Sequence, residues 1–228
     1  MFFDYYYLVL VMPAILFALW AQAQVSGTFE KFSKVRTMRG LTGAQAAEAV
    51  LRAGGVYDVR IERVSGNLTD HFDPRAKVIR LSDSVYDSPS VAAVGVAAHE
   101  AGHAVQHAQD YFPIKVRSAI IPVTQVGSSL ALPLIIIGLV LSSLNLVYLG
   151  IAFFGLSTVF QAVTLPVEFD ASRRAIATLG SEGLLSQEEL PGAKKTLRAA
   201  ALTYVAALAV SLAQLLRLLL LFGGRRDD

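Results

Sequence analysis

The segment His99-Glu100-Ala101-Gly102-His103 carries three side chains that could bind and use a metal ion. In a helix, His99 and His103 lie one turn apart on the same face, so both imidazoles can reach one tetrahedral Zn²⁺. Glu100, next to the first histidine, can take a proton from a water that this metal activates. The pattern therefore predicts a zinc site with Glu100 as its base.

Composition restricts the remaining ligands and the setting of this site. Of the 228 residues, 54% are hydrophobic and 17% are charged. Soluble proteins are about a quarter charged, so this balance indicates a membrane protein. Cysteine is absent, which leaves histidine, aspartate and glutamate as the expected zinc ligands. The net charge of +2 gives no reason to expect a nucleic-acid partner.

The first apolar segment runs from Tyr5 to Phe29 without a charged residue, which is long enough to span a bilayer. A cleaved signal peptide is the alternative interpretation. Because Asp4 and no Lys or Arg precedes the segment, we favour an uncleaved anchor.

The charge-free stretch from Ser118 to Val167 is too long for one span and has the length of two. It predicts a helical hairpin over Ala119–Leu141 and Leu146–Leu165, with a buried soluble hairpin as the alternative. A fourth apolar segment runs from Ala199 to Phe222. Its Arg217 lies near the helix end and is expected to snorkel to the lipid headgroups.

Between the first two spans the sequence predicts a small water-soluble unit. A capping box at Thr42 starts a helix. Alternation in Tyr57–Val64 and in Ala76–Leu81 predicts two strands of a β-hairpin. Ser88 is expected to cap the helix that carries the two histidines.

Three features near this helix are candidates for supporting roles. The second strand, through Val78, Ile79 and Arg80, could bind an extended substrate along its edge, or be an ordinary structural strand. His71, just before it, could stabilise an oxyanion or be a loop histidine. His107 continues the histidine stripe and could orient a ligand, or simply lie near the helix end.

A catalytic zinc site usually has three protein ligands, so a carboxylate must complete the set. Glu168 is preferred, because it follows the predicted hairpin directly and returns to the side where the helix of His99 meets the membrane. Asp170 is the reserve ligand, or a residue behind the ligands that orients a histidine by hydrogen bonding. An exposed carboxylate at a helix N-terminus is the alternative for Glu168.

Lys and Arg gather in the loops that contain the candidate ligands, at 31–117 and 173–198. The positive-inside rule then places these segments in the cytoplasm. Arg225 and Arg226 oppose this assignment, unless the last segment does not fully cross.

Several segments together resemble the YugP-type bacterial membrane zinc metallopeptidases: Asp70–Arg75, the following strand, His99–Gln106, Pro166–Ser172 and Leu190–Lys195. The resemblance covers nearly the whole chain. It implies a multi-pass cell-membrane protein in which His99, His103 and a downstream Glu bind zinc and Glu100 is the catalytic base.

A more distant similarity is to the HtpX and CAAX-protease group of membrane zincins. Their third-ligand Glu stands in a pattern of Glu, aromatic, any residue, Ala, Asp. Glu168-Phe169-Asp170-Ala171 fits this pattern, and Ser172 replaces the final Asp. Asp170 is a candidate substitute for it.

The predicted fold is a mainly α membrane protein with about four transmembrane helices and a small zincin-like α+β unit, which carries a β-hairpin and the HExxH helix. The expected divisions are an anchor over 1–29, a cytoplasmic zincin-like unit over 30–117, a transmembrane hairpin over 118–167, a third-ligand helix and loop over 168–198, and a C-terminal helix and tail over 199–228.

The expected function is a zinc-dependent endopeptidase of the bacterial cell membrane, which hydrolyses membrane or membrane-adjacent proteins on the cytoplasmic side. Its expected partners are protein or peptide substrates and membrane lipid, and the sequence predicts no oligomeric state. One alternative is a non-catalytic scaffold or adaptor with a structural zinc site. Another is an intramembrane protease, which the short apolar lead Val91–Ala98 disfavours.

Overall fold

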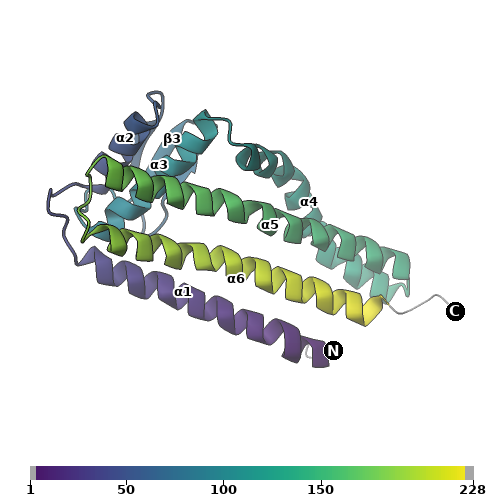
Figure 1. The fold of residues 1–228 in the computed structure, drawn as a ribbon. Coiled ribbons are helices and arrows are strands. Elements are labelled where there is room, and N and C mark those ends of the chain that lie inside the picture. Colours follow the sequence, from purple (N-terminus) through teal and green to yellow (C-terminus); the bar gives the residue numbers. More distant parts are fainter. Residues whose placement is uncertain (1–3, 224–228) are drawn as a thin grey trace. The chain divides into compact units, whose positions relative to one another are not determined.

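The computed structural model describes residues 4–223, and the chain is 72% helical with one three-stranded sheet. It divides into two compact units. Residues 22–115 and 166–202 form one, here called the HEAGH unit after the motif at residues 99–103. Residues 4–21, 116–165 and 203–223 form the other, here called the apolar unit. The mainly α prediction with a small α+β unit is confirmed (Figure 1).

Four helices are long and apolar enough to cross a membrane. The first starts as a π-helical turn, η1 (Tyr7–Val11), and continues as α1 (Met12–Ser33). The others are α4 (Phe112–Val140), α5 (Leu144–Ser181) and α6 (Leu190–Phe222). Their most apolar windows have mean hydropathies of 1.9 to 2.2 and are at most 28% buried. Helices with such exposed apolar surface are suited to lipid, as the sequence predicts.

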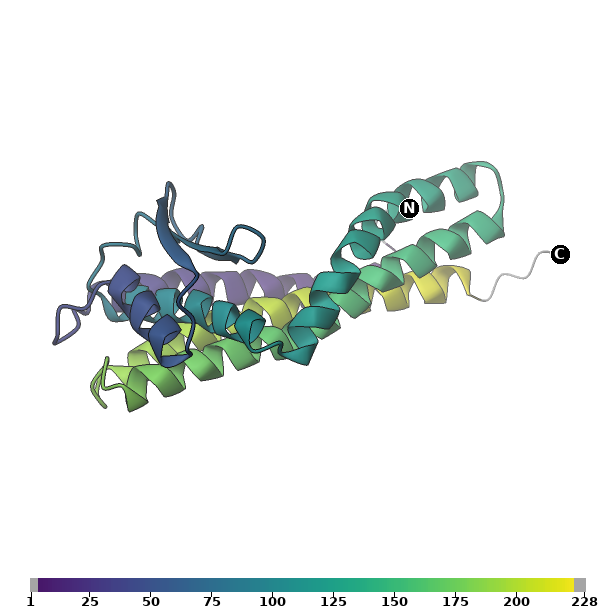
Figure 2. The same cartoon turned by 90° about the horizontal axis from the view of Figure 1, so that it is seen from above.

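In the apolar unit, α4 and α5 form the predicted helical hairpin, joined by a tight turn in which Ser142 has a φ of 52° (Figure 2). Glycines allow the two helices to approach closely. A Cβ added at Gly150 would lie 2.7 Å from the carbonyl oxygen of Ala131. One added at Gly138 would lie 2.8 Å from the backbone nitrogen of Val147. Small residues at such contacts are typical of helix packing in membranes.

Arg217 of α6, which is expected to snorkel, has a carboxylate partner at the start of the N-terminal segment. Its Nε donates to Asp4 Oδ2 at 2.9 Å, its guanidinium lies 5.3 Å from the centre of the Tyr7 ring, and its side chain is 12% exposed. A carboxylate partner offsets the cost of holding the charge in an apolar setting. The pair joins the N-terminal segment to α6 within the apolar unit.

The HEAGH unit contains a sheet of order β1-β3-β2. Its strands are β1 (Arg60–Val64), β2 (His71–Asp73) and β3 (Val78–Ser82). β1 pairs with β3 in parallel, and β2 pairs with β3 antiparallel. The hairpin therefore consists of β2 and β3, and not of the two strands that the sequence predicts.

This topology corrects the predicted substrate strand. Val78, Ile79 and Arg80 lie in β3, which is central and has a strand on each side. Both sides of its backbone are therefore occupied, and the prediction that β3 is a free edge is wrong. The edges of the described sheet are β1 and β2.

Two further helices pack in this unit, α2 (Gly43–Ala53) and α3 (Val91–Ala108). The predicted capping box of α2 is present, because the Thr42 side chain accepts from Gln45 N and the Gln45 side chain accepts from Thr42 N. The N-cap of α3 is Ser90 and not Ser88, since Ser90 Oγ accepts from Ala93 N at 3.2 Å.

The core of the HEAGH unit surrounds α3. All alanines of this helix except Ala108 are buried together with residues of α1, α2, β3, α5 and α6. Their small side chains let neighbouring backbones come near a helix that is buried on most of its surface.

The third apolar segment and the candidate third-ligand segment form one element. α5 continues without a break through Pro166 to Ser181. α6 likewise begins at Leu190, so that Pro191 lies in its first turn, where a missing N–H costs nothing. Candidate residues on α5 and α6 therefore belong to helices that also have residues in the apolar unit.

Candidate metal centre

Gly102 allows α3 and α5 to cross in close contact. A Cβ at this position would lie 2.7 Å from the carbonyl oxygen of Ala171, a distance that real Cβ atoms do not reach. The motif residues on either side, His99 and His103, consequently face the turn of α5 that carries Glu168. The glycine inside the motif is therefore a packing requirement of the site.

The crossing brings three candidate ligands together. Nitrogens of His99 and His103 and a carboxylate oxygen of Glu168 all lie within 4.8 Å of one another. Glu168 Oε2 is 3.3 Å from His99 Nε2 and 3.4 Å from His103 Nε2. The Glu168 side chain is only 3% exposed. An exposed carboxylate at a helix N-terminus, the alternative for Glu168, does not match this burial within α5.

Hydrogen bonds on the far side of each imidazole fix its orientation. His103 Nδ1 lies 3.0 Å from Gln106 Oε1. The amide nitrogen of Gln106 donates to Val167 O at 2.8 Å and to Asp170 Oδ2 at 2.9 Å, so its oxygen is the acceptor for His103. His103 therefore carries its proton on Nδ1 and presents the Nε2 lone pair to the cluster.

Ser172 has the equivalent place for the other histidine. Its Oγ lies 3.1 Å from His99 Nδ1, and with this nitrogen as donor His99 also presents Nε2 to the cluster. These roles of Gln106 and Ser172 are not predicted from the sequence. Gln106 lies three residues after His103, and Ser172 lies four residues after Glu168, so helical spacing is the signal that could have found them.

The residues fit a bound zinc ion. Two imidazole nitrogens and one carboxylate oxygen are a ligand set of catalytic zinc sites. Glu168 Oε2 is fully buried and has no hydrogen-bond partner among the described residues, which is costly unless a cation binds it. Burial acts to lower the pKa of His103, but the Glu168 and Glu100 carboxylates raise it by more. The site thus has a local field that favours positive charge.

Asp170 lies behind this cluster. It accepts from Gln106 and forms ion pairs with Arg173 and Arg174, the latter at 2.5 Å. Its contacts match the expected orienting role, because Gln106 connects it to His103. The three-residue cluster does not include Asp170.

Glu100 is partly exposed, and its charge acts on the carboxyl group of Asp70. Asp70 accepts from Ser82 N at 2.8 Å and from Ser82 Oγ at 3.0 Å. Burial raises the pKa of Asp70, and the negative charge of Glu100 adds to the effect. Asp70 is not predicted as a site residue from the sequence, and its carboxyl group interacts electrostatically with the candidate base.

The other two histidines lie outside the cluster. His71 is exposed on β2, with Nδ1 2.9 Å from Thr69 O and Nε2 3.5 Å from Arg80 Nη1. His107 is exposed near the end of α3, and its ring packs edge-on against Phe72 at 5.9 Å. No contact described for either residue reaches the three candidate ligands.

The fold and the site together define a helical membrane protein with a buried His/His/Glu cluster. The chain belongs to the family described as "Putative neutral zinc metallopeptidase", whose model matches residues 7–223. It is 46% identical over 222 residues to "Putative membrane protease YugP" of Bacillus subtilis (strain 168). The match covers 97% of this chain and 99% of that protein. No solved structure matches the chain.

Proposed function

We propose that this protein is a zinc-dependent endopeptidase of the cell membrane, which hydrolyses membrane or membrane-adjacent proteins on the cytoplasmic side. His99, His103 and Glu168 hold the ion, and Glu100 is the catalytic base. The observation that carries the proposal is the orientation of both Nε2 atoms toward a buried glutamate oxygen without a hydrogen-bond partner among the described residues. Family membership and the relative's printed name support the peptidase class.

Bound zinc supplies a Lewis acid that polarises the scissile carbonyl and makes a water easier to deprotonate. Glu100 takes the proton of the attacking water and passes it to the leaving amine. Gln106 and Ser172 hold the two imidazoles with their Nε2 lone pairs toward the ion.

The substrate backbone is proposed to pair with β2. Of the two edges of the described sheet, β2 is the one that contacts α3, as the packing of Phe72 against His107 shows. A peptide added to this edge runs beside the helix of the candidate ligands. His71 lies on the same strand, which keeps it a candidate for contact with substrate.

The test is Glu100→Gln, with cleavage measured in cells and zinc content measured on the purified full-length protein. The amide cannot accept the proton, and we expect cleavage of a co-expressed membrane substrate to fall by about 10²- to 10⁴-fold, while zinc content stays at one per chain. Glu182→Gln is the control, because Glu182 is exposed near the end of α5. Full cleavage by Glu100→Gln would refute the mechanism.

A scaffold with a structural zinc site is the second candidate. It predicts that the wild-type protein contains zinc and cleaves no unfolded or membrane protein. Metal analysis combined with the same cleavage assay separates the two functions.

A further inference from the structure

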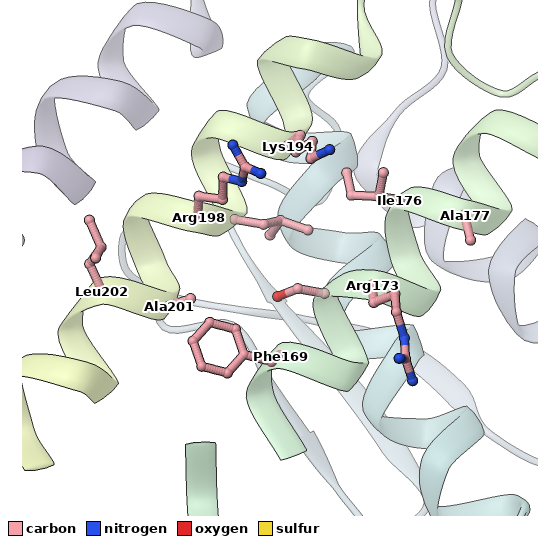
Figure 3. A pocket seen from close by; sticks show the side chains of 10 residues that line it. Phe169, Arg173, Ile176, Ala177, Lys194, Arg198, Ala201 and Leu202 are labelled. Atoms are coloured by element: carbon pink, nitrogen blue, oxygen red, sulfur yellow. The ribbon is translucent and has the colours of Figure 1, made fainter. Parts of the chain in front are cut away.

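A groove of about 730 Å³ lies between α5 and α6 in the HEAGH unit. Its apolar lining includes Phe169 and Ile176 of α5 and Leu197 and Leu202 of α6. The basic side chains of Lys194 and Arg198 also line it (Figure 3). The volume lies within the usual range of ligand sites. Phe169 is 49% exposed, so the apolar part is open to a ligand.

The polarity of the groove changes along the two helices. The lining residues of α5 extend from Phe169 to Ala177, and those of α6 extend from Lys194 to Leu202. Figure 3 shows Phe169 beside Ala201 and far from Lys194. Phe169 and Leu202 lie at the end where both helices continue into the apolar unit. Arg198 and Lys194 lie about 6 and 12 Å further along α6 from Leu202.

This change from apolar to basic lining matches the boundary between the hydrocarbon core and the headgroup layer on the cytoplasmic side of a bilayer. The headgroup layer adds about 5–8 Å on each side of the hydrocarbon core. If the core ends near Leu202, Arg198 lies at the depth of the phosphates. The groove thus offers apolar surface at acyl-chain depth and basic groups at headgroup depth.

The two basic side chains are available for an anion. Both are exposed, and in the described part of the chain neither forms an ion pair with a carboxylate. Arg173 also lines the groove, but its guanidinium is bonded to Asp170. Figure 3 shows Arg198 and Lys194 directed to the same end of the groove and Arg173 pointing elsewhere.

We propose that this groove binds one anionic phospholipid. The phosphate contacts Arg198 and Lys194, and an acyl chain lies along Phe169, Leu197 and Leu202. A lipid with a choline headgroup carries a positive charge of its own, which is repelled by these basic groups. It therefore binds more weakly than an anionic lipid. None of these contacts involves the candidate zinc ligands themselves, although Ser172, which contacts His99, also lines the groove.

The test is native mass spectrometry of the full-length protein in detergent, titrated with dimyristoyl phosphatidylglycerol or dimyristoyl phosphatidylcholine. We expect the first bound phosphatidylglycerol to bind at least about fivefold more tightly than phosphatidylcholine. The double variant Lys194→Gln/Arg198→Gln should weaken phosphatidylglycerol binding by about thirtyfold, since each basic group near an anionic headgroup contributes about a factor of five.

Lys31→Gln/Lys195→Gln is the matched control. It removes the same charge from exposed positions in the same unit, and Lys195 is adjacent to Lys194 but does not line the groove. We expect at most a twofold change. Ala177→Phe keeps all charges and places a bulky side chain in the groove at a lining position that is exposed. We expect it to weaken phosphatidylglycerol binding as much as Lys194→Gln/Arg198→Gln does.

Three results would overturn the proposal. The first is an equal loss of phosphatidylglycerol affinity in both double variants, which would mean a diffuse charge effect. The second is equal affinity for both lipids. The third is displacement of the lipid by equimolar glycerol phosphate, which would mean a site for a soluble phosphate. Zinc content and the far-ultraviolet circular dichroism of each variant show that it is folded, independently of any peptidase activity.

Discussion

Gly102 and Gly150 meet the same steric constraint in two different units of the molecule. At each position an added Cβ would lie 2.7 Å from a backbone carbonyl oxygen, that of Ala171 or of Ala131. In the HEAGH unit the contact brings His99 and His103 to a buried carboxylate. In the apolar unit it joins two helices whose contact surface is largely aliphatic. One close crossing thus positions chemical groups, and the other holds two spans together.

The largest expected effect separates these two crossings. In Gly102→Ala the new methyl meets a backbone atom that cannot rotate away, so α3 and α5 must move apart at the candidate ligands. Overpacking of this kind costs about 1–3 kcal/mol, which corresponds to a zinc affinity about five- to 150-fold weaker if the strain is relieved by opening the site. Zinc content after dialysis against a graded chelator measures it.

Two control variants sharpen this prediction. Gly95→Ala places a methyl 3.3 Å from the Ala193 side chain, so a small shift suffices and zinc is retained. Gly150→Ala is expected to lower the melting temperature and to retain zinc, because the ligands are held within the HEAGH unit. Zinc loss in Gly150→Ala equal to that in Gly102→Ala would show instead that assembly of the site depends on the hairpin of α4 and α5.

The second prediction concerns the buried polar contacts of the HEAGH unit. Gln106→Leu removes the acceptor for His103 Nδ1 and the donor for Val167 O and Asp170. Loss of such an orienting partner weakens metal affinity by about 10- to 100-fold. Gln109→Leu is the matched control at the C-cap of the same helix, since Gln109 is exposed and contacts Arg174. Isothermal titration with zinc would contradict the orienting role if both variants bound equally well.

The sequence predicts best those features that are local or periodic. The spans follow from long charge-free segments, and the spacing of His99 and His103 follows from one helical turn. Glu168 was selected as the partner by its place after a predicted hairpin. The structure brings it to the histidines through the crossing at Gly102, a contact between residues distant in the chain.

What the sequence could not predict depends on pairing between distant segments. β2 has three residues, and its neighbours Asp70 and Pro74 are typical of a turn, so no alternation marks it as a strand. Without β2 the two longer strands are expected to pair as a hairpin, although β1 and β3 are parallel. That error made β3 an edge strand. Gln106 was missed for a related reason, because its role needs both His103 and the backbone of α5.

The smallest expected effect is in the apolar unit, at the pair of Asp4 and Arg217. Each single variant, Asp4→Ala or Arg217→Leu, leaves one charge without its partner in an apolar setting, and we expect a lower melting temperature in detergent. The double variant removes both charges and should recover most of the loss, which is the sign of a direct interaction. Zinc content should be unchanged in all three, because the pair and the candidate ligands belong to different units. Additive losses in the double variant would mean that Arg217 does not depend on Asp4 and is stabilised at the headgroups, as its position near the helix end first suggested.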